Sequence, residues 1–393
     1  MSNSPQNKTP PCVLQILPRL GVGGVERTTL DVSRALAGAG WRSIVASAGG
    51  ALQEAVTRGG SKHITLPLHS KNPATVLANV ARLRNCIREH RVDILHARSR
   101  MPAWSALMAS RWCGVPLVTT YHSTVHEAPA WKRWYNSVMT RGDVVTAASH
   151  YNGGRIRSAH GDFRARLEVI VAGIDMNAFD PARCDSAQLS RLRTSWRADG
   201  RTVAMLPGRL DKNKGHEVFI EALARMKPPR PLGVIVGGSA KASGRVYQES
   251  LHQRVRALGL EGDVVFAGTI DADDIPLAYA AADIIVAPSV FAEPFGRVAV
   301  EAQAMERVIV ASDIGGFRET ICTDPSARTG WLVEVGNAEA LAQALGEVAA
   351  LEASERTGIG RRARIDAAAK FSLKQMCEKT LELYRQILSQ NLP

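Results

Sequence analysis

Residues 13–39 read VLQILPRLGVGGVERTTLDVSRALAGA, an apolar run followed by a glycine-rich turn and an amphipathic segment. The run, Val13–Pro18, is almost continuously apolar rather than alternating. That pattern is typical of a strand in a parallel sheet covered on both faces. The segment Val25–Ala39 has the character of a helix that packs one face inward. A strand, a tight turn and a helix in this order predict the opening unit of an α/β fold.

The same alternation continues along the first half of the chain. Further strand-like runs are Ser43–Ala48, His63–Leu68, Asp93–His96, Pro116–Tyr121, Val144–Ala148 and Leu167–Ala172. Helical segments between them include Pro73–His90 and Pro102–Trp112. Alternating strands and helices predict a doubly wound domain built on a parallel sheet.

The pattern restarts in the second half. Its strand-like runs are Thr202–Pro207, Leu232–Val236, Val264–Ala267, Ile284–Pro288 and Val308–Ser312, with helical segments His216–Met226, Tyr247–Leu258 and Val298–Met305. We therefore expect two doubly wound, Rossmann-like domains, residues 1–180 and 181–370, joined through a polar linker within residues 174–200. We expect the last helix, residues 371–393, to pack back toward the first domain. Ligands bind at the carboxyl ends of such sheets, so a central cleft faced by both sheets is the expected site.

Composition narrows the class of protein. The chain has 393 residues, of which 45% are hydrophobic and 22% charged, as in an ordinary globular protein. Its six cysteines are scattered without a CxxC pair, which indicates neither a zinc knuckle nor a disulfide framework. No apolar stretch approaches the roughly 20 residues of a membrane span, and the polar residues 1–11 lack the apolar centre of a secretory signal. We expect a cytoplasmic protein.

The positive charge is concentrated in the first half. Through Asp180 there are 22 Lys and Arg against 11 Asp and Glu, a net of +11, whereas the remainder has 27 against 26, a net of +1. This asymmetry predicts an anionic partner for the first half, such as nucleic acid, anionic lipid or a phosphorylated glycan. The low aromatic content of 5% and the lack of a base-stacking motif argue against nucleic acid.

Several residues that follow strands in the first half are candidates for a site. Gly23 and Gly24 open a helix between Arg19 and Arg27, and a dinucleotide fingerprint fails because its third glycine falls at Glu26. A loop that approaches an anion and a simple tight turn both remain open interpretations.

A histidine follows each of two neighbouring strands of the first half. His122 stands at the end of the fifth strand, at the expected cleft edge. His96 ends the preceding strand and is the alternative for the same role, with Arg98 and Arg100 directly after it.

In the second half, Arg209 and Lys214 follow the first strand, and Gly215 permits close approach at the start of a helix. Two cations beside a helix N-terminus suit a diphosphate, although solvated surface cations are the plainer interpretation. Glu293 and Glu301 stand on either side of Gly296, where another helix begins, and their carboxylates can accept hydrogen bonds from sugar hydroxyls.

Other motifs are weak or missing. The stretch Asp271–Asp274 contains a DxD pattern, but it precedes a helical segment and capping explains it better than metal binding. The zinc-protease, α/β-hydrolase and Walker signatures do not occur in the sequence.

The spacing Glu293-x7-Glu301, together with the Gly208–Gly215 segment and Gly315-Gly316-x-x-Glu319, resembles glycosyltransferase family 4. The resemblance covers essentially the whole chain. It implies the GT-B fold and a retaining, metal-independent hexosyltransferase with no cofactor besides its nucleotide-sugar substrate.

Within that family, the likeness is strongest to lipopolysaccharide core mannosyltransferases of α-proteobacterial type. It rests on the stretches Gly23–Thr29, His96–Trp104 and Thr119–His122. It implies transfer of mannose from GDP-mannose to a lipopolysaccharide core acceptor. The alternatives are UDP-glucose, ADP-heptose or another nucleotide sugar used for a different glycan, or a sugar-nucleotide epimerase.

The resemblance assigns the donor site to Gly23, Gly24, Arg209, Lys214, Glu293, Phe295, Gly296 and Glu301. The two cations hold the diphosphate, Glu301 holds the ribose hydroxyls, and Glu293 holds the donor sugar with help from the backbone near Phe295 and Gly296. Catalysis falls to His122, beside the anomeric carbon, and to Arg209, Lys214 and Glu293. Arg297 departs from the leucine that is frequent at its position in the family.

The acceptor is expected to meet Arg19, Arg98 and Arg100 of the first domain. An anionic glycolipid in an anionic leaflet accounts for the positive charge there, which implies a peripheral enzyme on the cytoplasmic face of the inner membrane. Trp131 and Trp134, beside Lys132 and Arg133, are candidate interfacial anchors or ordinary helix aromatics.

Overall fold

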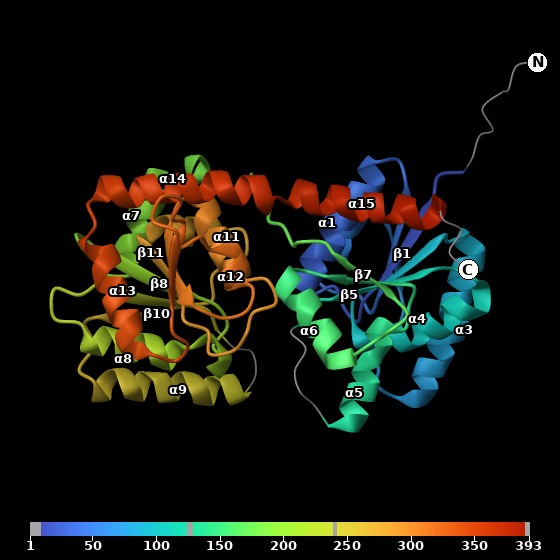
Figure 1. Cartoon of the computed structure of the whole chain (residues 1–393), viewed down its shortest axis with the longest axis horizontal. Coiled ribbons are helices and arrows are strands. Elements are labelled where there is room, and N and C mark those ends of the chain that lie inside the picture. The colour runs from blue at the N-terminus through green and yellow to red at the C-terminus, as the bar shows by residue number, and fades with distance from the viewer. Residues whose placement is uncertain (1–8, 124–128, 239–241, 390–393) are drawn as a thin grey trace, which may run out of the picture. The chain divides into compact units, whose positions relative to one another are not determined.

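The computed structural model describes residues 9–123, 129–238 and 242–389 of the chain (Figure 1). It forms two compact units. Unit 1 contains Met1–Val171 and Lys374–Pro393, and unit 2 contains Ala172–Leu373. Each unit is a parallel sheet with helices on both faces, so the predicted fold class of two Rossmann-like α/β domains is confirmed.

The sheet of unit 1 has the strand order β3-β2-β1-β4-β5-β6-β7, and neighbouring strands are parallel. The strands are β1 (Cys12–Ile16), β2 (Arg42–Ser47), β3 (Lys62–Thr65), β4 (Ile94–Ala97), β5 (Leu117–Tyr121), β6 (Val144–Ala147) and β7 (Arg166–Val169). The order reverses between β1 and β4. The loops after these two strands therefore leave in opposite directions and open a crevice at the carboxyl edge, where ligands bind in such sheets.

The helices of unit 1 are α1 (Gly24–Gly38), α2 (Gln53–Arg58), α3 (Pro73–His90), α4 (Arg100–Cys113), α5 (Ala130–Asn136), η1 (Ser137–Thr140), α6 (His150–His160) and the C-terminal α15 (Leu373–Ser389), which belongs to unit 1 from Lys374. The residues at the start of α3 explain why the helix begins there. The Asn72 side chain accepts a hydrogen bond from the Ala74 N–H at 2.9 Å, and Pro73 occupies the first helical position, where its missing N–H costs nothing.

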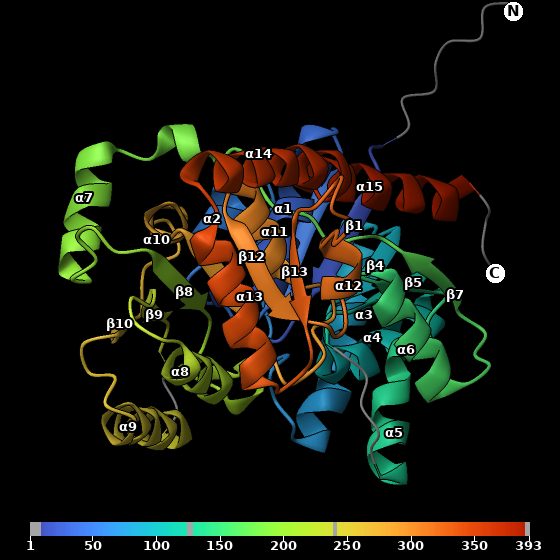
Figure 2. The ribbon, with the colours of Figure 1, turned by 60° about the vertical axis from the view of Figure 1, so that its left-hand side comes forward.

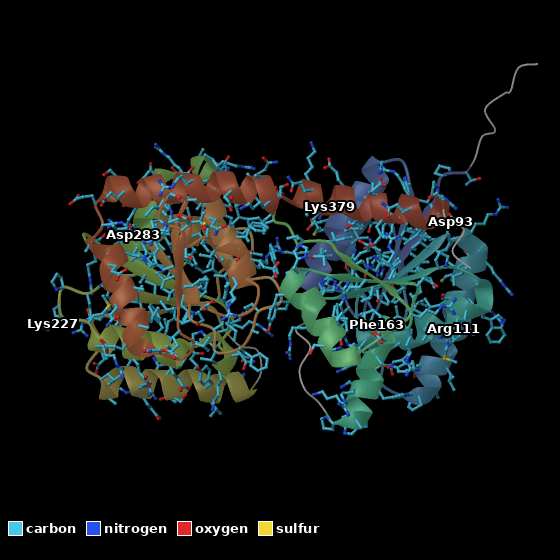
Figure 3. The ribbon with its side chains drawn as sticks, in the orientation of Figure 1. Asp93, Arg111, Phe163, Lys227, Asp283 and Lys379 are labelled. Carbon is cyan, nitrogen blue, oxygen red and sulfur yellow. The ribbon has the colours of Figure 1, made fainter. Side chains whose placement is uncertain are left out.

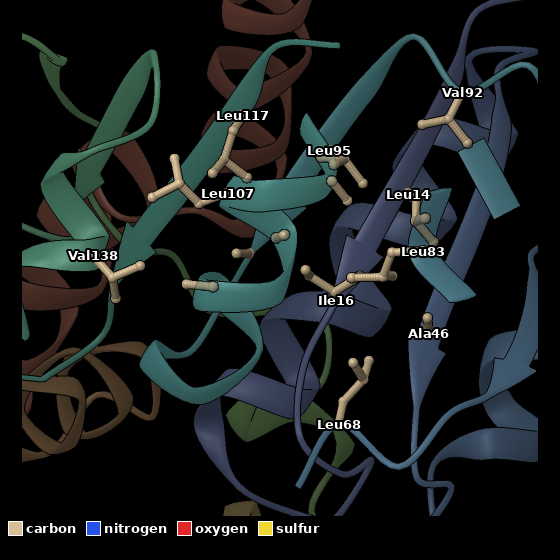
Figure 4. Close-up of a cluster of buried hydrophobic side chains, with 14 of the residues drawn as sticks. Leu14, Ile16, Ala46, Leu68, Leu83, Val92, Leu95, Leu107, Leu117 and Val138 are labelled. Atoms are coloured by element: carbon tan, nitrogen blue, oxygen red, sulfur yellow. The ribbon is translucent and has the colours of Figure 1, made fainter. Parts of the chain in front are cut away.

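Packing between the helices and the sheet stabilises unit 1. Figure 4 shows Leu14 and Ile16 of β1 beside Leu83 of α3, and all three are fully buried. Full burial of a side chain of this size contributes about 1.5–3 kcal/mol. The core therefore fixes the carboxyl edge of the sheet as a rigid platform for the loops above it.

The sheet of unit 2 has the order β10-β9-β8-β11-β12-β13, again parallel throughout, with the reversal between β8 and β11. The strands are β8 (Val203–Pro207), β9 (Leu232–Val236), β10 (Val264–Gly268), β11 (Ile284–Ala287), β12 (Val308–Ser312) and β13 (Gly330–Val333). The sequence analysis missed β13. This short edge strand begins at Gly330 and two of its four residues are half-buried, so its apolar signal is weak.

Helices cover both faces of the unit 2 sheet (Figure 2). They are η2 (Pro181–Arg183), α7 (Ser186–Ser195), η3 (Lys212–Lys214), α8 (His216–Arg225), α9 (Ala242–Ala257), α10 (Ile275–Ala281), α11 (Arg297–Ala304), α12 (Phe317–Thr320), α13 (Ala338–Ala350) and α14 (Ala353–Lys370). Contacts pair α8 with α13 and α11 with α14. None of the helices in the described part of the chain has the length and apolar character that a membrane span requires.

The boundary between the units differs from the expected positions 180 and 371. The N–H of Ile174 donates to the carbonyl of Phe371 at 3.0 Å, and the N–H of Leu373 donates back to Ile174 at 2.8 Å. These bonds tie both crossing segments into unit 2. The expected linker, residues 174–200, contains α7, which packs against α10 and so belongs to unit 2 as well.

Candidate functional site

A cavity of about 470 Å³ opens at the switch point of unit 1. Its walls are residues that follow β1, β4 and β5, among them Pro18, Arg98, Ser99, Arg100, Thr120, His122 and Ser123, together with His69, Lys71 and Tyr135. Arg98, Arg100 and Lys71 are cations, and none of the described residues that line this cavity is a carboxylate. The cavity is therefore electropositive and suits an anionic group.

Arg98 is the buried cation of this cavity, with 3% of the residue exposed. Its Nε donates to Gln15 Oε1 at 2.8 Å, and its buried Nη2 has no hydrogen-bond partner among the described residues. Burial lowers the pKa of Arg98 from its ordinary value, because the charged form loses solvation. An arginine stays charged in proteins, so a positive group with an unused donor lies in the wall.

Arg100 lies at the start of α4 and reaches the carboxyl end of β5. It donates a hydrogen bond to Ser123 Oγ, and its guanidinium carbon lies 5.6 Å from the centroid of the Tyr121 ring. These contacts hold the second arginine over the cavity.

The two candidate histidines, His96 and His122, have different environments in the structure. His96 is buried with both ring nitrogens engaged, Nδ1 with Tyr384 Oη at 2.5 Å and Nε2 with Thr120 Oγ1 at 2.6 Å. His122 lines the cavity, and its buried Nε2 has no partner in the described part of the chain. Burial, and then the charge of Arg98, lowers the pKa of His122 to about 3, so its ring is neutral at cellular pH. Of the two candidates, His122 alone presents to the cavity a nitrogen without a partner among the described residues.

The predicted glycine turn does not join this cavity. Gly23 caps α1 with ordinary negative φ, and neither Gly23 nor Gly24 lines the cavity. Glu26 Oε2 lies 2.6 Å from where a Gly23 Cβ would stand, so a carboxylate already covers the helix start. Arg19 is exposed and is also absent from the cavity wall. Of the three expected acceptor arginines, Arg98 and Arg100 line this cavity, and the role of Arg19 stays a prediction.

Charged residues also gather at the switch point of unit 2, but there they form pairs. Lys214 follows β8 and Glu293 follows β11, and Lys214 Nζ lies 2.5 Å from Glu293 Oε1. Ser289 Oγ donates to the same oxygen at 3.3 Å. Each side chain of the ion pair is 23% exposed, so the pair is partly shielded from water. The loops after β8 and β11 thus bring a positive and a negative side chain into contact.

Close backbone contacts fix these loops. Gly215 has φ +73°, and a Cβ there would lie 1.8 Å from the carbonyl oxygen of Pro288. Gly315 has φ +64°, and a Cβ there would lie 2.6 Å from the carbonyl oxygen of Glu293. Only glycine satisfies both conditions, so these glycines set the position of the Lys214–Glu293 pair.

Glu301 lies on α11 and is also engaged. Arg297 Nε donates to its Oε1 at 2.6 Å, and the Tyr279 hydroxyl donates to its Oε2 at 2.9 Å. Arg297 stands one turn before Glu301, which gives its departure from leucine a structural account: it forms an i,i+4 ion pair. Each carboxylate oxygen can accept a further hydrogen bond, so the pair leaves room for a ligand hydroxyl.

The other predicted donor residues differ in exposure. Arg209 is exposed and makes no hydrogen bond or ion pair within the described residues. The Phe295 ring is buried and packs edge-on against Phe371 at 5.7 Å, so only its backbone can serve a ligand. Gly296 has φ +85° and caps α11 without a side-chain hydrogen bond, which leaves the first N–H groups of that helix available.

In the described regions, which include the DxD stretch, no group of three metal-binding side chains occurs. The prediction that this stretch caps the following helix is confirmed for the position of Asp274 but not for a side-chain hydrogen bond. Asp274 occupies the N-cap position of α10, but its side chain makes no capping hydrogen bond. Sequence analysis also missed two cavity residues, Lys71 and Tyr135, because neither directly follows a strand.

Comparison with known proteins identifies the family. The model of glycosyl transferases group 1 matches residues 191–368, and that of glycosyltransferase family 4 matches residues 22–178. The curated D-inositol 3-phosphate glycosyltransferase of Salinispora tropica is 28% identical over 76% of this chain. The chain spans 65% of that relative's length.

Two solved structures share the whole fold. A glycosyltransferase from Rickettsia africae ESF-5 is 32% identical, with 96% of this chain and 99% of that chain covered and a TM-score of 0.86. Anabaena Alr3699/HepE, solved in complex with UDP-glucose, is 25% identical, with 95% and 99% covered and a TM-score of 0.82. The two family models together cover most of the sequence, and the Rickettsia africae enzyme matches along nearly its full length. This chain therefore belongs to glycosyltransferase family 4 and is a transferase of the GT-B type.

Proposed function

We propose that this glycosyltransferase moves a hexose from a nucleotide sugar to a glycolipid acceptor that carries anionic groups. In this proposal the donor is GDP-mannose and the acceptor is the lipopolysaccharide core, as the sequence resemblance implies. The enzyme needs no metal ion and works as a peripheral protein at the cytoplasmic face of the inner membrane.

The unpartnered cation in the unit 1 cavity carries the acceptor part of the proposal. Arg98 Nη2 is buried without an acceptor, and no carboxylate lines the cavity around it, as far as the described residues extend. The charge of Asp31 opposes the lowering of the Arg98 pKa, but the buried Nη2 donor still has no acceptor among the described residues. A buried polar group without a hydrogen bond is costly, and a ligand that brings acceptors and negative charge offsets that cost. The phosphate or carboxylate groups of an acidic glycolipid supply both.

The unit 2 loops support the donor part. Breaking the glycosidic bond builds negative charge on the diphosphate and positive charge on the sugar. Arg209 and Lys214 supply fixed cations, and the free N–H groups at the start of α11 add partial positive charge. Glu293 holds Lys214 in place before the donor arrives, since their ion pair already exists. Its other oxygen, Oε2, accepts no hydrogen bond from the described residues and is open to a sugar hydroxyl.

His122 fits a role as a neutral hydrogen-bonding group beside the reacting carbon. A protonated ring would add positive charge next to the one that develops on the sugar, and the low pKa of His122 prevents this. In the retaining reaction the bond from the anomeric carbon to the diphosphate breaks. The acceptor oxygen forms its bond on the same face, and the acceptor proton passes to the leaving phosphate.

A UDP-sugar is the second candidate donor, because the relative from Anabaena was solved with UDP-glucose. ADP-heptose and a sugar-nucleotide epimerase follow from the sequence alternatives. These candidates differ in one observable property: an epimerase converts its nucleotide sugar without any acceptor.

The test uses the full chain with GDP-mannose, UDP-glucose or ADP-heptose, each with and without lipopolysaccharide core acceptor. Mass analysis of the glycolipid should show one added hexose with GDP-mannose only, and excess EDTA should not change the yield. Glu301→Ala and Lys214→Ala should both lose the product. Transfer from UDP-glucose would reassign the donor, and donor conversion without acceptor would overturn the transferase proposal in favour of the epimerase.

A further inference from the structure

Exposed aromatic side chains lie on α4 and α5 of unit 1, the helices that also contribute Arg100 and Tyr135 to the cavity described above. We define the α4–α5 surface by Trp104, Met108, Arg111 and Trp112 of α4, Trp131, Lys132, Arg133 and Trp134 of α5, and Arg141 after η1. Trp131 is 71% exposed, Trp112 is 65% exposed, Trp134 is 59% exposed and Met108 is 44% exposed. Large apolar side chains this exposed and this close together mark an interaction surface.

Contacts between the two helices make these residues one surface. The Trp104 and Trp134 rings stack with centroids 4.7 Å apart, which joins α4 to α5. The Arg141 guanidinium lies 5.4 Å from the Trp104 centroid and 5.8 Å from the Trp134 centroid. At the other end of α4, the guanidinium of Arg84 lies 4.7 Å from the Trp112 centroid. An arginine thus lies beside the Trp104–Trp134 pair, and another lies beside Trp112.

The surface carries positive charge only. The segments α4, α5 and η1 contain four Lys and Arg residues and neither Asp nor Glu, and Arg141 follows directly. Unit 1 as a whole has 25 Lys and Arg against 11 Asp and Glu, a net of +14, whereas unit 2 has 24 against 26, a net of −2. The excess charge of the chain therefore lies entirely in the unit that carries the exposed tryptophans.

A cavity of about 700 Å³ adjoins this surface. Arg111 and Arg141 belong to both, and Arg164 and Arg166 line the cavity from the other side; Figure 3 labels Arg111 and Phe163 of its wall. Two carboxylates, Asp143 and Asp162, also line it. Asp143 accepts the Leu117 N–H at 2.7 Å, and Arg166 is paired with Glu168 at 2.6 Å. Arg111 and Arg141 make no ion pair within the described residues, so their charges are available.

We propose that the α4–α5 surface docks unit 1 onto the surface of an anionic phospholipid bilayer. Tryptophan rings with one apolar and one polar edge favour the level of the lipid headgroups. Lysine and arginine are attracted to an anionic leaflet. The exposed tryptophans, the cationic α4 and α5 segments and the unpaired Arg111 and Arg141 at the adjoining cavity fit such a surface. The inference rests on the peripheral location in the proposed function and assigns the surface that makes the contact.

The test is sedimentation of the full chain with vesicles of phosphatidylcholine alone or with 30% phosphatidylglycerol, an amount of about one third chosen to give a negative surface. We expect binding to the anionic vesicles only, and its loss in high salt. The double variant Lys132→Glu/Arg133→Glu should bind at least about tenfold more weakly, as two attractions become repulsions. Trp131→Ser should weaken binding by a smaller factor that salt does not alter.

Matched controls separate docking from other effects. Lys374→Glu/Lys379→Glu makes the same charge change on α15, and Ile365→Ser removes a residue of unit 2 that is also 71% exposed. Both should bind vesicles like the wild type, and melting curves should show that all variants fold. Transfer to a detergent-dispersed acceptor should stay unchanged in Lys132→Glu/Arg133→Glu, so a failed reaction and a failed docking surface are distinguishable. Equal binding by that variant and the wild type would overturn the inference, as would equal binding to neutral vesicles.

Discussion

The carboxyl edges of the two sheets have the same topology but opposite electrostatic states. At the unit 2 edge Lys214 is paired with Glu293, as Arg297 is with Glu301. At the unit 1 edge Arg98 has an unused buried donor, and the described residues of the cavity wall include no carboxylate. Unit 2 therefore holds the charges of these two pairs in place before a ligand arrives, whereas unit 1 keeps a charged donor that a ligand can engage.

The difference predicts that the loss of one cation lowers activity at both edges but lowers stability more at the unit 2 edge. Removing one member of a partly buried ion pair leaves the other charge without its partner, which destabilises the fold. Removing Arg98 relieves the desolvation cost of a buried charge, which offsets part of what its lost contacts cost. Variants that delete one cation from each edge test the comparison directly.

The largest effect is expected from Lys214→Met. The variant loses a cation that stabilises the departing diphosphate, and losses of one such group lower the rate by about 10²–10³-fold. It also leaves Glu293 unpaired, so the melting temperature should fall. Steady-state transfer rates and thermal melts measure both effects. Lys212→Met is the matched control on the same turn, since Lys212 is exposed and makes no ion pair among the described residues.

The counterpart in unit 1 is Arg98→Met. Loss of a charged hydrogen bond of about 1.5–3 kcal/mol should raise the KM for an anionic acceptor by about 10–100-fold. The melting temperature should fall less than that of Lys214→Met, because relief of the buried charge offsets part of the cost of leaving Gln15 Oε1 without its donor. Acceptor titrations at saturating donor measure the first effect. A fall in melting temperature as large as that of Lys214→Met would contradict the contrast between the two edges.

The sequence predicts every described strand but β13, their parallel arrangement and the residues at their ends, because apolar runs and strand-end positions are local properties. It cannot predict how the side chains there pair. Lys214 and Glu293 are far apart in the chain, and their contact depends on the glycines that bring two loops together. The same limit explains the open choice between His96 and His122, since the partner of His96 is Tyr384, near the other end of the chain.

Tyr384→Phe tests that choice. His96 should act as a structural residue, so removing the Tyr384 hydroxyl leaves its Nδ1 buried without a partner, at a cost of about 1–3 kcal/mol in the free energy of unfolding. Donor and acceptor KM values should stay near those of the wild type at temperatures where the variant is folded. Chemical denaturation measures the stability, and His122→Phe is the counterpart, expected to lose transfer without a comparable loss of stability.

The smallest effect expected is a difference in acid sensitivity between the units. Burial lowers the pKa of His122 to about 3 and of His216 to about 4, and that of His96 well below its ordinary value of 6.5. In the unfolded chain each of these rings takes up a proton near pH 6.5, whereas the folded chain does not, so stability is complete above that pH and declines as the pH falls toward 4.

Unit 1 holds His96 and His122, and the pKa values of its His63 and His160 are also lowered, whereas His216 is the one histidine of unit 2 with a lowered pKa in the described chain. Hydrogen exchange at pH 7.5 and 5.5, corrected for the intrinsic rate, should therefore show a greater loss of protection in the strands of unit 1. His122→Phe should reduce that loss because its ring takes up no proton in either state. Equal losses in both units would mean that the buried histidines of unit 1 do not carry the difference.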